Sequence, residues 1–564
     1  MSVFAKTSGL FILALSLFPI ASKAQDKPRL ILQITVDQLR GDLPNRHFDE
    51  FGASGFRYLL EEGIYYDNAH HTHANTETVV GHTTLATGAN PAAHGMVGNL
   101  WYDRSKGRTV YNIEDADYSI LTSGADVDES TEIDPTQRAA TSDGRSPRTI
   151  LTSTFGDELA INTAGRAKVF GVSIKDRGAV AMAGHVGKAF WFSKSAGAFV
   201  TSSYYYDAYP AWVDAWNAKG VPQSYSGRSW ELLNPIDTYL FGERDDQPWE
   251  PDFAGFGRTF PHPLGTVEDK YFTTLLTLSP FGDRMTADFA KTLIDAEGLG
   301  DDDVTDFLAV SFSVTDYVGH FFGPSSLEAE DNLLQLDRTL ADLFAYVDAE
   351  IGLEHTLIVL SSDHGTPEAP GYLETIGMPG GYVTPDEWDT APAIARIKER
   401  FGLSGPLFEG YDHPYLTLSE AVRDDPDIDR VALETAIADE LVAFEGVAYA
   451  VPSSRLREGS LPDTALMRAV LNNYHPDRSG DIYVVFQPER FINDMDGLSV
   501  TVTHGSPWRY DTFVPILFAG FGLEPQRISR RVHTVDVAMT LSSVAETRPP
   551  SGAAGEVLPE VLGQ

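Results

Sequence analysis

The sequence predicts an α/β fold in which helices cover both faces of a mostly parallel central sheet. Short runs rich in Val, Ile, Leu and Phe, each too short for a helix, recur along the chain and are typical of buried parallel strands. These runs cover residues 30–36, 167–174, 307–312, 356–360 and 513–518. Between the third and fourth runs, apolar residues spaced three and four apart predict an amphipathic helix; they are Leu333, Leu336, Leu340, Leu343 and Val347. Strands that alternate with helices in this way favour a parallel sheet with crossover helices.

The chain begins with the features of a secretory signal peptide. Lys6 precedes an apolar run over residues 10–21, and the small-residue site Ser22-Lys23-Ala24 follows it. We therefore expect a signal peptide over 1–24, a mature chain over 25–564, and a periplasmic or extracellular protein. The alternative, a buried N-terminal helix, leaves the flanking Lys and the small residues without a role. No later segment approaches about 20 uninterrupted apolar residues, so we expect no stable insertion into a membrane.

Composition argues against a nucleic-acid-binding protein and against a fold that depends on disulfides. The 81 Asp and Glu residues against 42 Lys and Arg give a net charge of −39, and such a surface repels nucleic acid. With 0 Cys in 564 residues, the fold must depend on a large apolar core and not on disulfides. Nothing in the composition sets the oligomeric state.

Two long regions interrupt the alternation of strands and helices. Residues 190–290 are crowded with aromatics, Gly and Pro, which predicts a loop-rich insertion over one end of the sheet. Residues 368–500 contain a predicted helix over 431–444 and a predicted strand over 482–486, which indicates a small cap subdomain.

Acidic and histidine side chains follow several of the predicted strands or precede the last one. In chain order they are Asp37, Asp316, His320, Asp363, His364 and His504. Open parallel sheets bind ligands beyond the carboxyl ends of their strands, so these side chains are expected to converge on one crevice. Three carboxylates with three imidazoles suit Zn²⁺, which accepts oxygen and nitrogen donors. Taken singly, each residue has a plainer interpretation as a turn former, a helix cap or an ordinary histidine.

The segment 71–103 carries a candidate nucleophile. Thr78 is predicted to begin a helix that ends near Gly88. The free amides and the macrodipole at a helix N-terminus favour an alkoxide and an incoming phosphate. A threonine hydroxyl is a poor nucleophile unless a metal stabilises its deprotonated form. Without the nearby ligand set, Thr78 would be interpreted as an ordinary helix cap.

Six motifs, in this order, resemble a known superfamily. They are TVDQLRGD at Asp37, TVVGHTTLATGANPAAHGMVGN from Thr78 to Asn99, IKDRG at Lys175, TDYVGH at Asp316, SSDHGT at Asp363 and THGSPWRYD at His504. Together they resemble the alkaline phosphatase superfamily, most closely its threonine-nucleophile, phosphate-irrepressible (PafA-type) bacterial alkaline phosphatases. The resemblance implies an alkaline phosphatase-like catalytic domain over 25–564, with the regions 190–290 and 368–500 outside the motifs.

The resemblance implies a hydrolase with two Zn²⁺ ions. It assigns one ion to Asp316, His320 and His504, and the other to Asp37, Asp363 and His364. Thr78 lies against the second ion and forms a phosphothreonine intermediate. Phosphate oxygens are assigned to Asn99, Lys175 and Arg177.

The implied substrates are small-molecule phosphate monoesters. A diester replaces one charged oxygen with a bulky ester group that cannot use the Lys175 and Arg177 donors. A phosphodiesterase or nucleotide pyrophosphatase of the same superfamily is the first alternative, since it also uses Thr and two zincs. The second is an inactive phosphate- or zinc-binding module, which requires a broken site, and no expected position is missing. The physiological substrate and its leaving group stay open.

Overall fold

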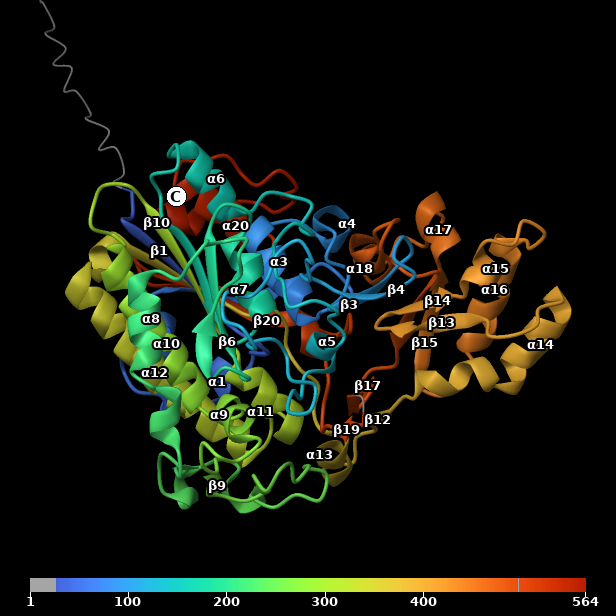
Figure 1. Ribbon diagram of the computed structural model, residues 1–564, viewed down its shortest axis with the longest axis horizontal. Helices are drawn as coiled ribbons and strands as arrows, with labels where there is room; N and C mark the ends of the chain where they lie inside the picture. The colour runs from blue at the N-terminus through green and yellow to red at the C-terminus, as the bar shows by residue number, and fades with distance from the viewer. Residues whose placement is uncertain (1–26, 496, 564) are drawn as a thin grey trace, which may run out of the picture.

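A large mixed sheet forms the body of the protein (Figure 1). The computed structural model describes residues 27–495 and 497–563, so the signal peptide expected over 1–24 lies outside the described residues. Across the sheet the strand order is β21-β2-β20-β11-β1-β10-β5-β6-β7, and β22 also pairs with β2. The strand bounds are β1 Leu30–Val36, β2 Ile64–His70, β5 Val169–Ser173, β6 Lys188–Ser193, β7 Ala198–Val200, β10 Asp306–Phe312, β11 Thr356–Ser361, β20 Phe513–Gly520, β21 Gln526–Ile528 and β22 Val532–His533.

The centre of the sheet is parallel, as the sequence predicts. β1 pairs in parallel with β10 and β11, and β10 pairs in parallel with β5, which confirms the fold class. The last predicted strand is different: β20 runs antiparallel to β11 and to β2, so the expectation of a parallel strand there is wrong. The chain returns to the carboxyl end of β11, where Gly365 donates to the carbonyl of Asp511. Only the short helix α19 (Arg509–Thr512) precedes β20, and a parallel strand needs a longer crossover.

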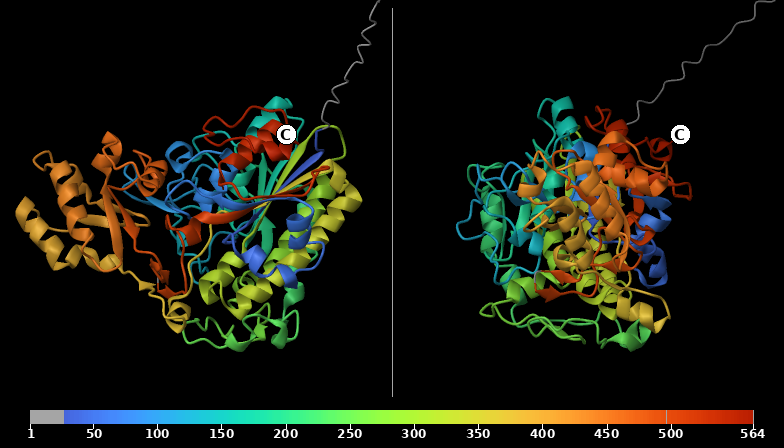
Figure 2. Two further views of the ribbon diagram at one scale, coloured as in Figure 1. Left: turned by 180° about the vertical axis from the view of Figure 1, so that it is seen from behind. Right: turned by 90° about the vertical axis from the view of Figure 1, so that its right-hand side faces the viewer.

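Helices cover both faces of the sheet (Figures 1 and 2). One face carries α10 (Phe281–Glu297), α11 (Val314–Phe322) and α12 (Leu327–Glu350), and the other carries α3 (Thr78–Thr87), α6 (Phe155–Asn162), α7 (Asp176–Ala183) and α20 (Asp536–Val544). Side chains of β1 alternate between the two cores: Leu32 and Ile34 belong to the first, and Ile31 to the second. Among the described residues, no helix is both long and apolar enough to cross a membrane.

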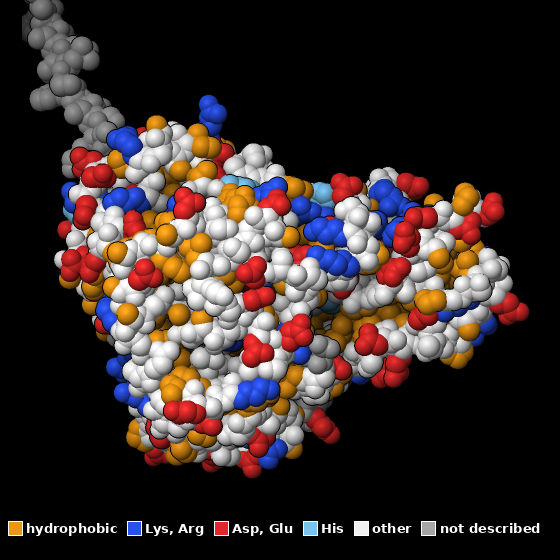
Figure 3. Space-filling model, in the orientation of Figure 1, with side chains coloured by type: hydrophobic (Ala, Val, Ile, Leu, Met, Phe, Trp, Pro, Cys, Tyr) orange, Lys and Arg blue, Asp and Glu red, His pale blue; other side chains and the backbone are white. Residues whose placement is uncertain are grey.

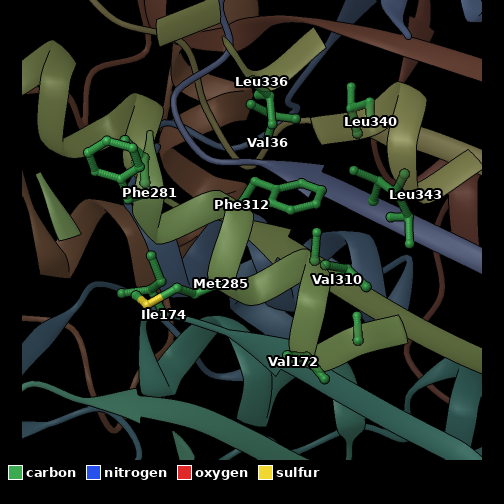
Figure 4. Close-up of a cluster of buried hydrophobic side chains, with 14 of the residues drawn as sticks. Val36, Val172, Ile174, Phe281, Met285, Val310, Phe312, Leu336, Leu340 and Leu343 are labelled. Carbon is green, nitrogen blue, oxygen red and sulfur yellow. The ribbon is translucent and has the colours of Figure 1, made fainter. Parts of the chain in front are cut away.

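The core under α12 fixes the ends of the central strands (Figure 4). Val36, at the end of β1, and Phe312, at the end of β10, pack beneath Leu336, Leu340 and Leu343 of α12. All five apolar positions of the predicted helical face are buried. Each such side chain stabilises the fold by about 1.5–3 kcal/mol, so the strand ends beyond this core are held firmly.

Most of region 368–500 forms a separate lobe, called the cap lobe below, that projects from the body (Figures 1 and 2). Its antiparallel sheet has the order β13-β14-β16-β15, with bounds Phe408–Asp412, Tyr415–Leu418, Ile482–Phe486 and Val447–Pro452. Its helices are α14 Pro392–Phe401, α15 Glu420–Arg423, α16 Arg430–Leu441, α17 Ser453–Glu458 and α18 Ala465–Asn473. A distinct hydrophobic cluster, which includes Leu433 and Ile482, joins α14 and α16 to this sheet.

The aromatic-rich region 190–290 begins inside the central sheet. β6 and β7 extend its edge, and α8 (Ala211–Ala218), β8 (Ser229–Trp230), β9 (His262–Pro263) and α9 (Phe272–Thr277) follow. The rings of Phe199 and Phe289 stack with centroids 4.2 Å apart, and Trp216 packs edge-on against both. Several of the aromatics that suggested a loop-rich insertion are therefore core residues of the body.

Candidate metal centre and active site

The six acidic and histidine residues singled out in the sequence meet at the carboxyl edge of the sheet. Asp37 directly follows β1, and Asp363 and His364 follow β11. Asp316 and His320 lie one turn apart on α11, which begins two residues after β10. His504 lies on the segment that returns from the cap lobe to β20. The antiparallel direction of β20 thus explains how a residue that precedes a strand reaches the same edge.

Asp37, Asp363 and His364 form a group that we call the buried cluster. All three residues are 0 % exposed. His364 Nε2 lies 3.3 Å from Asp37 Oδ1 and 3.4 Å from Asp363 Oδ2. None of these three atoms has a hydrogen-bond partner among the described residues. Because buried polar atoms without partners are costly, a cation that accepts their lone pairs fits this group.

Asp316, His320 and His504 form a second group, the open cluster. Asp316 Oδ1 lies 3.3 Å from His320 Nε2 and 3.4 Å from His504 Nε2. The imidazole centroids of His364 and His504 are 3.5 Å apart, so the two clusters are adjacent. Asp316, His364 and His504 also offer ligand atoms within 4.8 Å of one another. The structure therefore contains a candidate acidic and histidine metal-binding site.

Backbone carbonyls orient all three imidazoles in the same way. Nδ1 of His320 donates to the carbonyl of Val502 at 2.8 Å, and Nδ1 of His504 donates to that of Thr76 at 2.9 Å. Nδ1 of His364 donates to the carbonyl of Gly365 at 3.0 Å. A carbonyl oxygen cannot donate, so each Nδ1 carries a proton, and Nε2 is the ring atom left for a metal. This is the form in which histidine binds metals.

The carboxyl groups of Asp37 and Asp316 differ in charge balance. Burial, together with the nearby carboxylates of Asp316 and Asp363, raises the pKa of Asp37 well above its usual value. Burial also acts on Asp316, but His320 and Lys175 outweigh it and hold that pKa well below its usual value. Burial lowers the pKa of His364 to about 3, which keeps its Nε2 unprotonated.

Thr78 is the first residue of α3 and is buried beside the clusters. Arg177 Nη2 donates to Thr78 Oγ1 at 3.3 Å. Further along the first turn, a Cβ on Gly81 would stand 1.9 Å from the Asp363 carbonyl oxygen, so only glycine permits this close approach. The helix ends at Thr87, before Gly88 with φ 64°, as the sequence predicts. The N-terminus of α3 is therefore packed directly against the turn of the buried cluster.

The predicted phosphate-binding residues take different positions. Asn99 Oδ1 accepts from the Val79 amide at 3.0 Å, and its side-chain nitrogen, Nδ2, makes no hydrogen bond within the part of the chain that the structure describes. Arg177 is held by Asp134, with Nη1 to Oδ2 at 2.6 Å. Lys175 Nζ lies 2.7 Å from Asp37 Oδ2 and also contacts Asp316, so it joins the two clusters.

A cavity of about 190 Å³ opens beside the open cluster. Asn99 and Arg177 line it, and Lys175 does not. Apolar side chains from three separate segments form much of its wall; they are Ile133, Tyr317, Phe321, Phe491 and Ile492. The cavity can thus hold a small ester, with its charged end near Arg177 and an apolar group against the wall.

Sequence reasoning missed several residues that support this site. Gln38 Nε2 donates to Asp316 Oδ1 at 2.8 Å, and its backbone amide donates to Asp363 Oδ1 at 3.2 Å. Its φ of 67° is uncommon for a residue other than glycine, and strained backbone of this kind concentrates at functional sites. Glu77 Oε2 accepts from the backbone amide of Asn99 at 2.9 Å, and His82 Nδ1 lies 3.1 Å from Asp363 Oδ2. Gln38 and His82 lie within motifs quoted above, and this was the only signal in the sequence that could have indicated them.

Comparisons with known proteins agree with this geometry. The family described as type I phosphodiesterase / nucleotide pyrophosphatase matches residues 31–507. The chain is 33 % identical to alkaline phosphatase PafA of Elizabethkingia meningoseptica over 96 % of each chain. It is 34 % identical to alkaline phosphatase PhoV of Synechococcus elongatus, over 95 % of this chain and 93 % of that one. A crystal structure of wild-type alkaline phosphatase PafA matches with a TM-score of 0.86 and 32 % identity, covering 95 % of this chain and 99 % of that one.

Proposed function

Because this chain belongs to the type I phosphodiesterase / nucleotide pyrophosphatase family and is a phosphomonoesterase of the alkaline phosphatase superfamily, we propose that it hydrolyses small phosphate monoesters through Thr78 at a two-zinc site. One observation carries the proposal. Thr78, whose hydroxyl is held by Arg177, begins the helix that packs against the turn of the buried cluster, and three carboxylate and imidazole atoms of this cluster have no hydrogen-bond partner among the described residues.

Two zinc ions suit the donor set. The buried cluster would hold one and the open cluster the other, since both combine carboxylate oxygens with Nε2 lone pairs. When bound, such ions stabilise negative charge on the oxygens around phosphorus.

Thr78 Oγ attacks the phosphorus of the monoester in the first step. The P–O bond to the leaving alcohol breaks, the hydroxyl proton of Thr78 passes to solvent, the alcohol oxygen takes a proton from water, and the phosphoryl group is now bonded to Thr78. In the second step water attacks the phosphothreonine, which releases orthophosphate and restores the hydroxyl. Each step inverts the configuration at phosphorus, so the overall reaction retains it.

We assign four groups to the phosphoryl oxygens. The Arg177 guanidinium points at Thr78 and is itself fixed by Asp134. The side-chain nitrogen of Asn99, Nδ2, makes no hydrogen bond among the described residues, and the N-terminal amides of α3 favour an anion. Lys175 also belongs to this set in our proposal, and its contacts with Asp37 and Asp316 let it balance the clusters as well.

Export to the periplasm or the cell exterior is part of the proposal. Its support is the apolar run over 10–21 between Lys6 and the small residues at 22–24. The presence of a cleaved N-terminus near residue 25 in protein isolated from its host checks it, and retention of residues 1–24 would contradict it.

The family's description favours one rival, a phosphodiesterase. We expect kcat/KM for p-nitrophenyl phosphate to exceed that for bis-p-nitrophenyl phosphate by orders of magnitude. We expect both activities to disappear on chelation and to return with zinc. A higher diesterase than monoesterase efficiency would establish the rival, and full turnover by metal-free protein would refute the two-zinc site.

A further inference from the structure

A second cavity, of about 620 Å³, lies between the cap lobe and the strands β3 (Leu100–Asp103) and β4 (Arg108–Tyr111). We call it the junction cavity. Cationic side chains line it; they are Arg104, Lys106, Arg423, Arg430, Arg457 and Arg478. Figure 3 shows Lys and Arg side chains gathered where the body meets the lobe. Five carboxylates, from Asp103, Glu114, Asp424, Asp477 and Asp481, line the cavity as well, so the six cations slightly exceed the anions here, whereas the whole chain has a net charge of −39.

The buried carboxylates at the junction cavity are too few for its arginines. Asp481 pairs with Arg104 at 3.5 Å and with Arg430 at 2.9 Å. Glu434 pairs with Arg430 at 3.3 Å and with Arg457 at 3.7 Å. Three guanidinium groups therefore share two carboxylates, both of them almost fully buried.

Arg478 adds a cation that no carboxylate balances at close range. Among the described residues, no carboxylate oxygen lies within 4 Å of its guanidinium. Its Nη1 donates to the Gly95 carbonyl at 2.7 Å, and its guanidinium lies over the Trp101 ring. Burial lowers the pKa of Arg478 to about 10, yet the group stays cationic at neutral pH. Of the other carboxylates that line the cavity, Glu114 is paired with Arg108, Asp103 lies 3.6 Å from Lys106, and Asp424 is mostly exposed. Asp103 and Asp477 also attract the Arg478 guanidinium, but neither forms an ion pair with it.

Two buried guanidinium nitrogens on lining residues have no acceptor among the described residues. They are Arg423 Nη1 and Arg430 Nε. The Arg423 side chain is only 10 % exposed, so bulk water does not readily satisfy its donor. Buried donors without acceptors are unfavourable, and an anion with several acceptor oxygens would satisfy them.

We propose that the junction cavity binds a phosphate-bearing anion at a site separate from the active site. Guanidinium groups bind phosphate oxygens through paired, charge-assisted hydrogen bonds. The cavity volume falls in the range of small-molecule sites. Free orthophosphate and the phosphoryl group of a larger monoester share this chemistry.

The bound anion ties the cap lobe to the body. Arg423, Arg430 and Arg457 come from the cap lobe, whereas Arg104 and Lys106 come from the β3–β4 hairpin. β3 begins directly after Asn99, which lines the active-site cavity. An anion in the junction cavity therefore holds the cap lobe against the hairpin that follows this residue.

Calorimetric titration of the zinc-loaded enzyme with inorganic phosphate tests the site. We expect two classes of binding site. The double variant Arg423→Gln/Arg478→Gln is expected to lose the class that corresponds to the junction cavity. Its inhibition constant for phosphate as a competitive inhibitor, which reports binding at the active site, is expected to stay unchanged. The double variant Arg396→Gln/Arg468→Gln is a matched control, because both side chains are at least 60 % exposed and lie outside the cavity. Titration with phenylphosphonate distinguishes the two possible ligands. If phenylphosphonate binds to the second class of sites, the cavity accepts phosphoryl groups of larger molecules. If it does not, the ligand is free phosphate.

A milder variant keeps the test decisive if the double variant does not fold. Lys106 is 49 % exposed, so Lys106→Gln leaves the core intact and is expected to weaken the second class about twofold to fivefold. A single class of sites in the native enzyme overturns the proposal. So does a second class that the cavity variants leave unchanged. Loss of hydrolysis with the second class intact would contradict the proposed function only.

Discussion

The buried cluster and the open cluster use the same kinds of ligand in different surroundings. The buried cluster is fully enclosed, and burial with neighbouring carboxylates raises the pKa of Asp37. In the open cluster the His320 and His504 side chains are 11 % and 6 % exposed, and both line the cavity. Its carboxyl group, Asp316, is stabilised in the charged form by His320 and Lys175.

This difference suits the two clusters to different groups in the reaction. The buried cluster packs against α3, which carries Thr78, so we propose that it serves the nucleophile and the phosphoryl group. The open cluster faces a cavity with an apolar wall, so we propose that it serves the leaving group and later the attacking water. The buried cluster also depends more on a cation, because it contains partnerless atoms and an unfavourable carboxylate.

The largest effect is expected when the two clusters are broken separately. Asp363→Ala removes an enclosed ligand and is expected to lower kcat/KM by on the order of 10³-fold or more, since even groups that merely orient metal ligands contribute about 10- to 100-fold. His320→Ala is expected to lose less, because its place is open to the cavity and water can occupy it. Steady-state kinetics with metal analysis of each purified variant checks both. If the two variants lose equal activity and equal zinc, the two clusters do not differ in their dependence on the metal.

The next effect concerns the phosphoryl oxygens beside the buried cluster. Arg177→Ala removes a donor aimed at Thr78 and is expected to lower monoesterase kcat/KM by about 10²- to 10³-fold, the usual contribution of one such donor. Diesterase activity is expected to fall much less, because a diester has one charged oxygen fewer. Lys175→Met is the comparison variant. If Lys175 acts only by balancing Asp37 and Asp316, its loss will reduce both activities equally and lower the zinc content.

A substitution that moves α3 tests the packing of the nucleophile on the buried cluster. Gly81→Ala places a Cβ 1.9 Å from the Asp363 carbonyl oxygen, so the helix must shift. A displacement of about 1 Å at a reacting group costs roughly 10²-fold, and we expect a loss of kcat of that size. Gly410→Ala in β13 is the control, since no atom lies within 4 Å of the added Cβ and the φ angle is not positive. A near-native kcat in Gly81→Ala would show that catalysis by Thr78 does not depend on the packing of α3 against the buried cluster.

The parts of this site that sequence could predict share one physical basis. Asp37 and Asp363 follow apolar runs that can only be central strands, and parallel strands end at one edge. The helix that begins at Thr78 is marked by the glycine at its end. In these cases a local pattern and a general rule of sheet topology were sufficient.

The remaining features depend on contacts that no local pattern encodes. Arg177 is fixed by Asp134, 43 residues earlier, and nothing in either segment indicates the other. The positive φ of Gln38 and the two carboxylate contacts of Lys175 arise only when three separate segments meet. The direction of β20 was misjudged because an apolar run shows that a strand is buried but not which way it runs.

The smallest effect is expected at the apolar wall beside the open cluster. Ile492 lines the cavity on the returning segment, so Ile492→Ala reduces the surface available to an apolar leaving group. Loss of a few methyl groups in such a pocket is worth about 1–3 kcal/mol, so kcat/KM for phenyl phosphate is expected to fall roughly tenfold. Efficiency toward methyl phosphate is expected to stay within about twofold, because that leaving group is too small to reach the wall. Val431→Ala, on the exposed side of α16, controls for general destabilisation. Because Ile492 touches neither Thr78 nor the buried cluster, an equal loss with both esters would place the leaving group elsewhere and remove the division between the two clusters.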